Sequence, residues 1–156
     1  MEAEQEALRE EWEDTQQGKH LTFLVDGEAL GVEIGYVKEI VGIQPIAQLP
    51  ETPAYIKGVI NLRGKIIPVI DMRLKFRKQP KEYTDRTCVI VLDTKSYTAG
   101  LIVDQVTEVL RIEQSDIVPP PEQAVGLGYI KGIGKADGQV KLLLDTEKLL
   151  AAEQPR

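Results

Sequence analysis

The chain is poor in the residues that many catalytic and metal-binding sites require. Its 156 residues include one cysteine, Cys88, and one histidine, His20. One cysteine cannot form an intramolecular disulfide, and this usage is typical of a reducing compartment. Cys88 opens the apolar run CVIVL, which predicts a buried and unreactive thiol. No cysteine and histidine spacing fits a zinc site, so we expect neither a metal nor another cofactor.

Other absences narrow the function further. The chain has no apolar run close to the roughly 20 residues that span a bilayer, so we expect a cytoplasmic protein without direct membrane insertion. Two phenylalanines and one tryptophan offer little surface for stacking on bases, which disfavours nucleic-acid binding. The motifs H-E-x-x-H, G-x-S-x-G and the P-loop are all missing. We therefore predict that the chain is not an enzyme.

The net charge of −6 is concentrated at one end of the chain. The first 16 residues carry seven acidic side chains and one arginine, and the rest of the chain carries 18 acidic and 18 basic side chains. We expect residues 1–17 to form an acidic arm, either a charged helix or a flexible segment. The neutral body, residues 18–152, is expected to dock through apolar and mixed surfaces, and residues 153–156 form a short tail.

The most informative pattern is an internal repeat. Residues 55–76 (YIKGVINLRGKIIPVIDMRLKF) align without a gap with residues 129–150 (YIKGIGKADGQVKLLLDTEKLL), and six of the 22 positions are identical. Ordinary composition gives about one or two such matches by chance. Upstream, residues 31–43 align with residues 100–112. The repeat predicts one small unit built twice, with the two copies packed against each other.

Short, closely spaced strands are expected in both copies, which lie at about residues 20–76 and 87–150. Roughly five strands per copy favour a small barrel over an open sheet. Residues 34–41 fit helical spacing and a strand equally well. The expected strands are 21–25, the return strand through 30–32, 56–62, 65–70, 87–93, 97–103, 105–112, 129–135 and 139–144. A helical turn at 72–76 and a terminal helix from about 145 to 152, capped by Asp145, complete the prediction.

Three residues inside these strands predict irregular geometry. Gly58 and Gly132 are repeat mates, and a glycine inside a strand predicts a bulge or a barrel corner. Pro68 has no N–H group, which predicts that its strand lies at an edge or a bulge. The surrounding run 66–70 is apolar on both faces, so the second copy or a partner is expected to cover its outer face.

The two copies differ at one predicted turn. Asn61-Leu62-Arg63-Gly64 in the first copy corresponds to Lys135-Ala136-Asp137-Gly138 in the second. The shared glycine follows from turn geometry, because glycine adopts positive φ at little cost. Arg63 is not explained in this way, because Asp137 fills the same turn. An arginine with five donors and a flat head suits partner recognition, although a solvated turn residue is the alternative interpretation.

Four segments together resemble the CheW family of chemotaxis coupling proteins. They are G-V-E-I-x-x-V-K-E-I at 31–40, N-L-R-G-x-I-I-P-V-I-D at 61–71, P-P-P-E at 119–122 and E-K-L-L at 147–150. The resemblance covers about residues 18–152. It implies a mainly β fold of two intertwined five-stranded Src-homology-3-like barrels with short helices, including a C-terminal helix.

The resemblance also implies a function without catalysis. Members of the family couple transmembrane chemoreceptors to the histidine kinase CheA, through the kinase's regulatory domain and the receptors' cytoplasmic signalling tip. By this resemblance we expect an adaptor that is recruited to membrane receptor arrays and is a monomer in isolation. The implied receptor-binding surface consists of Val37, Glu39, Gly58, Asn61, Arg63 and Gly100. The implied kinase-binding segment contributes Val118, Pro119, Glu122 and Gln123, where Gln123 replaces an aromatic residue that relatives can carry.

Three other interpretations stay open. A CheW-like barrel that binds a small ligand between its halves needs a pocket with convergent polar groups, and a related barrel could serve a chemosensory pathway other than motility. A small hydrolase needs an activity that depends on Asp71, Asp93 or Asp104.

Overall fold

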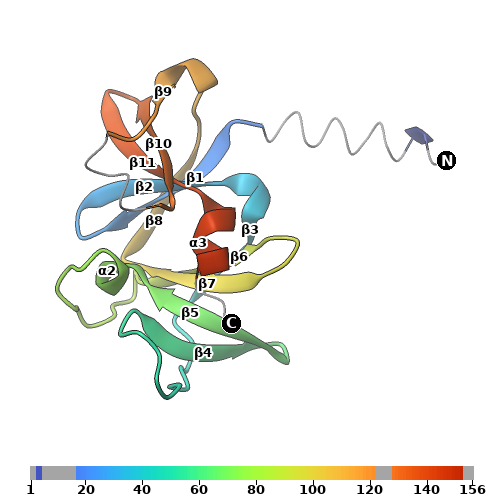
Figure 1. Cartoon of the computed structure of the whole chain (residues 1–156), viewed down its shortest axis with the longest axis vertical. Coiled ribbons are helices and arrows are strands. Elements are labelled where there is room, and N and C mark those ends of the chain that lie inside the picture. The colour runs from blue at the N-terminus through green and yellow to red at the C-terminus, as the bar shows by residue number, and fades with distance from the viewer. Residues whose placement is uncertain (1–2, 5–16, 122–127, 153–156) are drawn as a thin grey trace.

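The structure, a computed structural model, describes residues 3–4, 17–121 and 128–152, which form two β-sheets with short helices (Figure 1). Sheet A has the order β8-β1-β2-β11-β10-β9, and sheet B has the order β3-β6-β7-β5-β4. The strands of sheet A are β1 (Lys19–Val25), β2 (Glu28–Glu33), β8 (Gln105–Arg111), β9 (Ile117–Val118), β10 (Ile130–Ala136) and β11 (Gln139–Leu144). The strands of sheet B are β3 (Val37–Gly42), β4 (Ile56–Leu62), β5 (Lys65–Asp71), β6 (Cys88–Asp93) and β7 (Thr98–Val103). The short helices are η1 (Ile34–Tyr36), α2 (Met72–Lys75), η2 (Gln114–Asp116) and α3 (Thr146–Ala152).

Each sheet is assembled from both copies of the repeat. Sheet A takes β1 and β2 from the first copy and β8 to β11 from the second, whereas sheet B takes β3 to β5 from the first copy and β6 and β7 from the second. The chain therefore crosses between the sheets after β2 and crosses back after β7. Equivalent parallel pairs, β2 with β11 and β7 with β5, join the copies within each sheet. The predicted packing of the copies against each other is confirmed, and it is intertwined.

The expected strands and helices agree with the structure within one or two residues at their ends. The segment whose type stayed open, 34–41, divides into the single 3-10 turn η1 and the strand β3. Neither η2 nor β9 was predicted, because elements of three and two residues are too short to show a period. Residues 5–16 of the acidic arm and the tail 153–156 lie outside the described residues.

The glycine repeat mates both stand at bulges, as predicted. The pairing of β4 with β5 shifts register next to Gly58, and the pairing of β10 with β11 shifts next to Gly132. Gly58 has φ 144°, and a Cβ there would lie 2.1 Å from the carbonyl oxygen of Ala47. A Cβ at Gly132 would meet Ile117 Cγ2 at 2.8 Å and Val118 O at 3.0 Å. In each copy, the segment before the strand therefore approaches the glycine too closely for a side chain.

Pro68 corrects one expectation, because β5 is not an edge strand. It lies between β4 and β7 in sheet B. Val59 on β4 is the partner of Pro68 on β5, but its N–H and carbonyl groups bond to Ala47, which lies on the side of β4 away from β5. Val59 and Pro68 therefore form a pair without mutual hydrogen bonds. The parallel pairing with β7 begins only at Val69. The proline is therefore tolerated in an interior strand because neither neighbour needs its N–H.

The main apolar core lies between the two sheets, and a second core lies within sheet B. Strand β6 is buried on both faces, since Ile90 and Leu92 belong to the main core while Val89 and Val91 belong to the second. The prediction of a buried thiol is wrong, because Cys88 at the start of β6 is only half-buried. The outer face of the apolar run in β5 is partly uncovered, since Ile66 is 59% exposed.

Polar contacts also join the two copies. Arg73 in α2 binds Asp104, which follows β7, with Nε and Nη2 each 2.8 Å from a carboxylate oxygen, and its Nη1 lies 3.2 Å from Asp26 in the β1–β2 turn. Burial alone would raise the pKa of Asp104, but the hydrogen bonds from Arg73 and from the Asp26 backbone, with the charge of Arg73, lower it below its ordinary value. This ion pair therefore ties sheet B to a hairpin of sheet A.

A cation lies between two repeat-related aromatic rings at the same junction. Lys75 Nζ is 4.1 Å from the ring centre of Tyr55 and 5.2 Å from that of Tyr129. Each tyrosine also accepts a backbone hydrogen bond from the aspartate of its own copy, from Asp71 N at 2.7 Å and from Asp145 N at 2.6 Å. Both aspartates cap the helix that follows, as the capping prediction required for Asp145. The repeat is thus preserved in local geometry and not only in sequence.

Candidate functional site

The β4–β5 hairpin presents Arg63 at a two-residue turn. Arg63 and Gly64 have φ values of 51° and 88°, and Asn61 Oδ1 accepts a hydrogen bond of 2.8 Å from Gly64 N. Positive φ at both central positions matches the right-handed twist of a hairpin, and glycine, asparagine and aspartate are favoured there. Arginine in this conformation costs about 1–2 kcal/mol relative to ordinary backbone geometry. The arginine therefore occupies a position for which the turn itself favours other residues.

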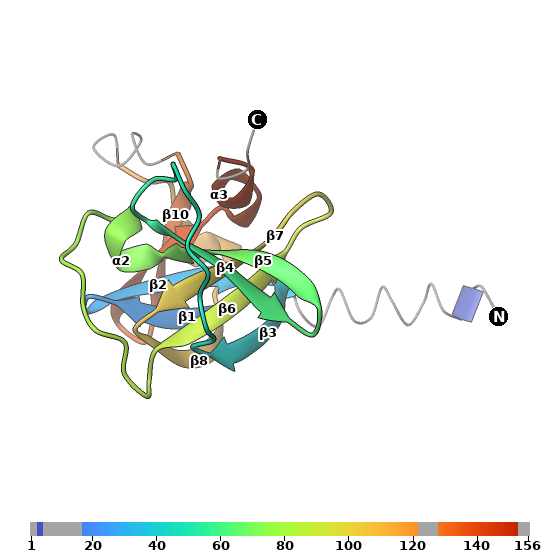
Figure 2. The same ribbon diagram turned by 90° about the horizontal axis from the view of Figure 1, so that it is seen from below.

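An ion pair fixes the direction of the Arg63 side chain. Its Nη1 donates to both carboxylate oxygens of Glu39 on β3, at 2.8 Å each. The Arg63 side chain is 74% exposed, whereas that of Glu39 is 24% exposed. Strands β3 and β4 stand at opposite ends of the sheet B order, yet the hairpin tip lies beside β3 (Figure 2). The curvature of sheet B thus brings together two residues that the chain separates by 24 positions.

A cavity of about 200 Å³ adjoins this ion pair. Its lining includes the basic side chains Lys38 and Lys65 and the apolar side chains Leu62, Ile67 and Val91. We call Lys38, Glu39, Asn61, Arg63, Lys65 and the exposed Ile66 the tip surface. Three of its charged residues are basic and one is acidic. The tip surface is therefore positively charged, and the apolar side chains of the cavity lie beside it.

Three of the six residues predicted to bind a receptor belong to the tip surface: Glu39, Asn61 and Arg63. The structure gives the other three local packing environments. Val37 is half-buried against the main core, and Gly58 is buried at the bulge described above. Gly100 is buried between β5 and β6, where a Cβ would lie 2.5 Å from Val89 Cγ1. Whether these three contact a receptor stays a prediction.

The predicted kinase-binding segment is described only in part. Val118 lies in β9 at the edge of sheet A and is 49% exposed, and Pro119 after it is also exposed. Glu122 and Gln123 lie outside the described residues. Figure 1 shows β9 and the β4–β5 hairpin at opposite ends of the molecule, so the two predicted surfaces do not compete for space.

Lys38, Lys65 and Ile66 were not predicted as members of the tip surface. Glu39 and Arg63 were both predicted as site residues, but not as an ion pair. Their opposite charges were visible, but their contact depends on how sheet B curves, and no local period reports that. Ile66 was part of the run recognised as apolar on both faces, which was the available signal.

The three aspartates considered for a hydrolase make separate contacts: Asp71 with Tyr83, Asp93 with Thr98 and Asp104 with Arg73. Within the described residues, no three histidine, cysteine, aspartate or glutamate side chains gather in a way that could hold a metal ion. No helix in the part of the chain that the structure describes is long and apolar enough to cross a membrane.

Comparisons with known proteins assign the fold and the family. The CheW-like domain family matches residues 19–154. A solved structure described as scaffolding protein TtCheW from Thermoanaerobacter tengcongensis superposes with a TM-score of 0.74 and 36% identity, covering 81% of this chain and 88% of that one. The chain therefore belongs to the CheW-like domain family, and the mainly β, duplicated fold implied by the sequence is confirmed.

Curated relatives extend this assignment to chemotaxis proteins. The chemotaxis protein CheW of Klebsiella aerogenes is 41% identical over 136 residues, which cover 86% of this chain and 82% of that protein. The protein FrzA of Myxococcus xanthus is 34% identical over 137 residues, covering 86% of each chain. The similarity thus spans more than four fifths of both relatives and not a single motif.

Proposed function

We propose that this chain is a non-enzymatic adaptor that couples chemoreceptors to the histidine kinase CheA, and that the receptor tip docks on the tip surface. The observation that carries the proposal is Arg63, which is 74% exposed in a backbone conformation unfavourable for arginine and oriented by Glu39. A residue that the turn disfavours, and that the second copy replaces by Asp137, is better explained by recognition than by stability.

The chemistry of the tip surface suggests the character of the receptor segment. Lys38, Arg63 and Lys65 give an excess of positive charge around the small cavity, and Ile66 is exposed on the same hairpin. We propose that an acidic side chain of the receptor contacts Arg63 while an apolar side chain packs on Ile66. The guanidinium offers further donors besides those engaged by Glu39, so it can bind the receptor without breaking that pair.

The proposed affinity for the receptor is modest. A small, transient interface of this kind is expected to bind at about micromolar strength, which corresponds to roughly −8 kcal/mol. Kinase control would then come from a difference in contacts between two array states and not from affinity alone. In this proposal the protein is cytoplasmic, monomeric in isolation and recruited to membrane receptor arrays.

The second proposed surface is the region of β9, with Val118 and Pro119, which would bind the regulatory domain of the kinase. An exposed apolar residue on an edge strand offers both a side-chain contact and unpaired backbone groups. Its place at the opposite end of the molecule from the tip surface (Figure 1) supports simultaneous binding of two partners, which an adaptor requires.

Calorimetric titration tests both surfaces separately. The full chain is titrated with the CheA regulatory domain and with a receptor signalling-tip fragment, as wild type and as Arg63→Glu. We expect Arg63→Glu to weaken receptor binding at least about tenfold, or 1.4 kcal/mol, and to leave kinase binding unchanged. Unchanged receptor binding by the folded variant would contradict the proposed site, and wild-type binding to neither partner would contradict the adaptor function itself.

A further inference from the structure

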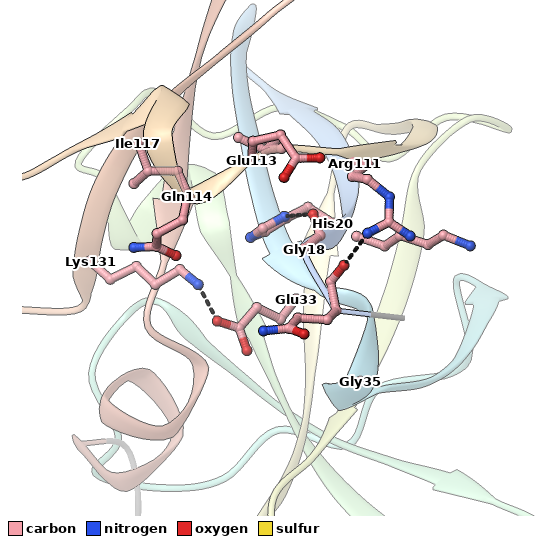
Figure 3. Close-up of a pocket in the computed structure, with 12 residues that line it drawn as sticks. Gly18, His20, Glu33, Gly35, Arg111, Glu113, Gln114, Ile117 and Lys131 are labelled. Atoms are coloured by element: carbon pink, nitrogen blue, oxygen red, sulfur yellow. Dashed lines mark hydrogen bonds and ion pairs between the residues drawn. The ribbon is translucent and has the colours of Figure 1, made fainter. Parts of the chain in front are cut away.

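A polar cleft of about 700 Å³ lies at the sheet A end of the molecule and shares no residue with the tip surface. Its walls come from the start of β1, the end of β2, the segment after β8 and the start of β10 (Figure 3). Both copies of the repeat therefore contribute to it. Its size falls within the range of about 300–1,000 Å³ that is usual for small-molecule sites.

His20, the chain's one histidine, faces this cleft with an unsatisfied nitrogen. The residue is 2% exposed, and its Nδ1 lies 2.9 Å from Gly18 O. Because a carbonyl oxygen only accepts hydrogen bonds, Nδ1 carries a proton. The other nitrogen, Nε2, is buried and has no hydrogen-bond partner among the described residues. In Figure 3 it points to the side of the cleft where Gln114 and Lys131 lie.

The protonation state of His20 determines what it can bind. Burial lowers the pKa of His20 below its ordinary value, and the nearby charge of Lys131 lowers it further, against the opposing effects of Gly18 and Glu33. The ring is therefore neutral at pH 7, and Nε2 presents a lone pair. Such a nitrogen requires a hydrogen-bond donor, which excludes a simple carboxylate as its partner.

The charges beside His20 are of both signs. Lys131 Nζ and Glu33 Oε1 form an ion pair between β10 and β2, and Glu113 and Arg111 also line the cleft. Arg111 already donates through Nη1 to Gln17 O at 2.7 Å. A purely anionic ligand would meet Glu33 and Glu113, and a purely cationic ligand would meet Lys131 and Arg111. A molecule with one group of each sign can instead separate Lys131 from Glu33 and satisfy both.

We propose that this cleft binds a small zwitterion, an α-amino acid, whose ammonium donates to His20 Nε2 and Glu33 while its carboxylate contacts Lys131. The ammonium supplies the donor that Nε2 lacks. The exchange of one intramolecular ion pair for two ligand contacts offsets the loss of the Lys131–Glu33 pair. Because Nε2 is buried, this binding mode requires the Gln114 side chain, which lies on the Nε2 side of the cleft (Figure 3), to move aside when the ligand enters. This site is separate from the tip surface, and it adjoins β9, because Ile117 of that strand lines the cleft.

The test uses the full chain and the twenty proteinogenic L-amino acids, each supplied singly. Calorimetry measures binding, and the imidazole nitrogen signals of isotope-labelled protein report on His20, which is unambiguous because the chain has one histidine. We expect at least one amino acid to bind one-to-one with a Kd of about 1 mM or tighter and to shift the Nε2 signal. Its N-acetyl and amide derivatives, which each lack one charge, should bind at least about fivefold more weakly.

Two variants locate the site. Glu33→Gln and Lys131→Met alter partly exposed side chains, so both are expected to fold, and each should weaken binding at least about fivefold. Asp137→Asn, at the distant β10–β11 turn, is the matched control and should have no effect. Absence of binding by all twenty amino acids at about 10 mM, an unchanged His20 signal, or binding that ignores both substitutions would overturn the proposal. In that case water alone occupies the cleft.

Discussion

The hairpin tips of the two copies have nearly the same backbone and different chemistry. Arg63 and Gly64 have φ values of 51° and 88°, and Asp137 and Gly138 have φ values of 53° and 73°. Aspartate is one of the residues that this turn favours, whereas arginine is not. The repeat therefore preserves the backbone of the hairpin, while the residues that the backbone does not require differ in chemistry between the two copies.

The residues that correspond to the ion-pair partner of Arg63 also distinguish the two hairpin tips. Glu39 pairs with Arg63 in the first copy, and its repeat mate in the second copy is Glu108. Asp137 and Glu108 are both acidic, so this pair of positions cannot form an ion pair in the second copy. Only the first copy therefore orients a cation at the tip of its hairpin.

The largest expected effect comes from the two bulge glycines. Gly58→Ala should destabilise the protein by about 3 kcal/mol or more, because the new Cβ meets a backbone oxygen at 2.1 Å and the backbone has positive φ. Gly132→Ala should cost about 1–2 kcal/mol, because its nearest contact is a side-chain methyl at 2.8 Å. Urea unfolding of both variants measures the difference. Equal losses would show that the two bulges are more alike than the structure indicates.

The ion pair between the sheets should make stability depend on pH in the acid range. The pKa of Asp104 is lower in the folded protein than its ordinary value of 3.8, so its contribution is complete above about pH 4 and is lost as pH falls through the folded pKa. Asp104→Asn should cost about 2 kcal/mol at pH 7, and the gap from wild type should narrow below pH 4.

Asp93→Asn is the control for this prediction, because Asp93 is exposed and bonds only to Thr98 among the contacts described here. The measurement is urea unfolding between about pH 2 and pH 7. A gap between wild type and Asp104→Asn that stays constant over this range would contradict the role assigned to the carboxylate. The repeat-related positions cannot form such a pair, because Gly35 replaces Asp104 and Glu147 replaces Arg73 there.

The smallest effect on stability should come from replacing Arg63, whose backbone conformation is unfavourable for arginine. Arg63→Gly removes a backbone cost of about 1–2 kcal/mol, of which the conformational entropy that glycine loses on folding offsets about 0.5–1 kcal/mol. It also loses an exposed ion pair worth up to about 0.5 kcal/mol. The net result should be unchanged or slightly increased stability, together with weaker receptor binding. Thermal unfolding and calorimetry check the two readouts. A loss of stability above about 1 kcal/mol would show that Arg63 stabilises the fold, and it would contradict the proposal that Arg63 serves recognition.

The duplicated β fold could be predicted from the sequence because the internal repeat indicated it. Tyr55, Gly58 and Asp71 recur as Tyr129, Gly132 and Asp145. Each of these residues has the same local structural role in both copies, so a role recognised in one copy could be predicted for the other. For Pro68 only the edge alternative was wrong, because the missing N–H indicates an edge or a bulge, whereas the start of pairing with β7 is set by distant strands.

The sites were harder to predict than the frame. Arg63 was found because it departs from its repeat mate, but its contact with Glu39 depends on the curvature of sheet B. The cleft at His20 gave no local signal, because its walls join Glu33, Arg111 and Lys131 from segments that lie far apart in the chain. Contacts of this kind follow from how the copies interlock and not from any one segment.

The most direct test of the account is an exchange of chemistry between the two tips. Asn61→Lys combined with Arg63→Asp gives the first tip the residues of the second, and Lys135→Asn combined with Asp137→Arg does the reverse. Titration of both double variants with the receptor fragment should show at least about tenfold weaker binding for the first and wild-type binding for the second. Equal binding by both variants would contradict the claim that the first copy alone carries the receptor site.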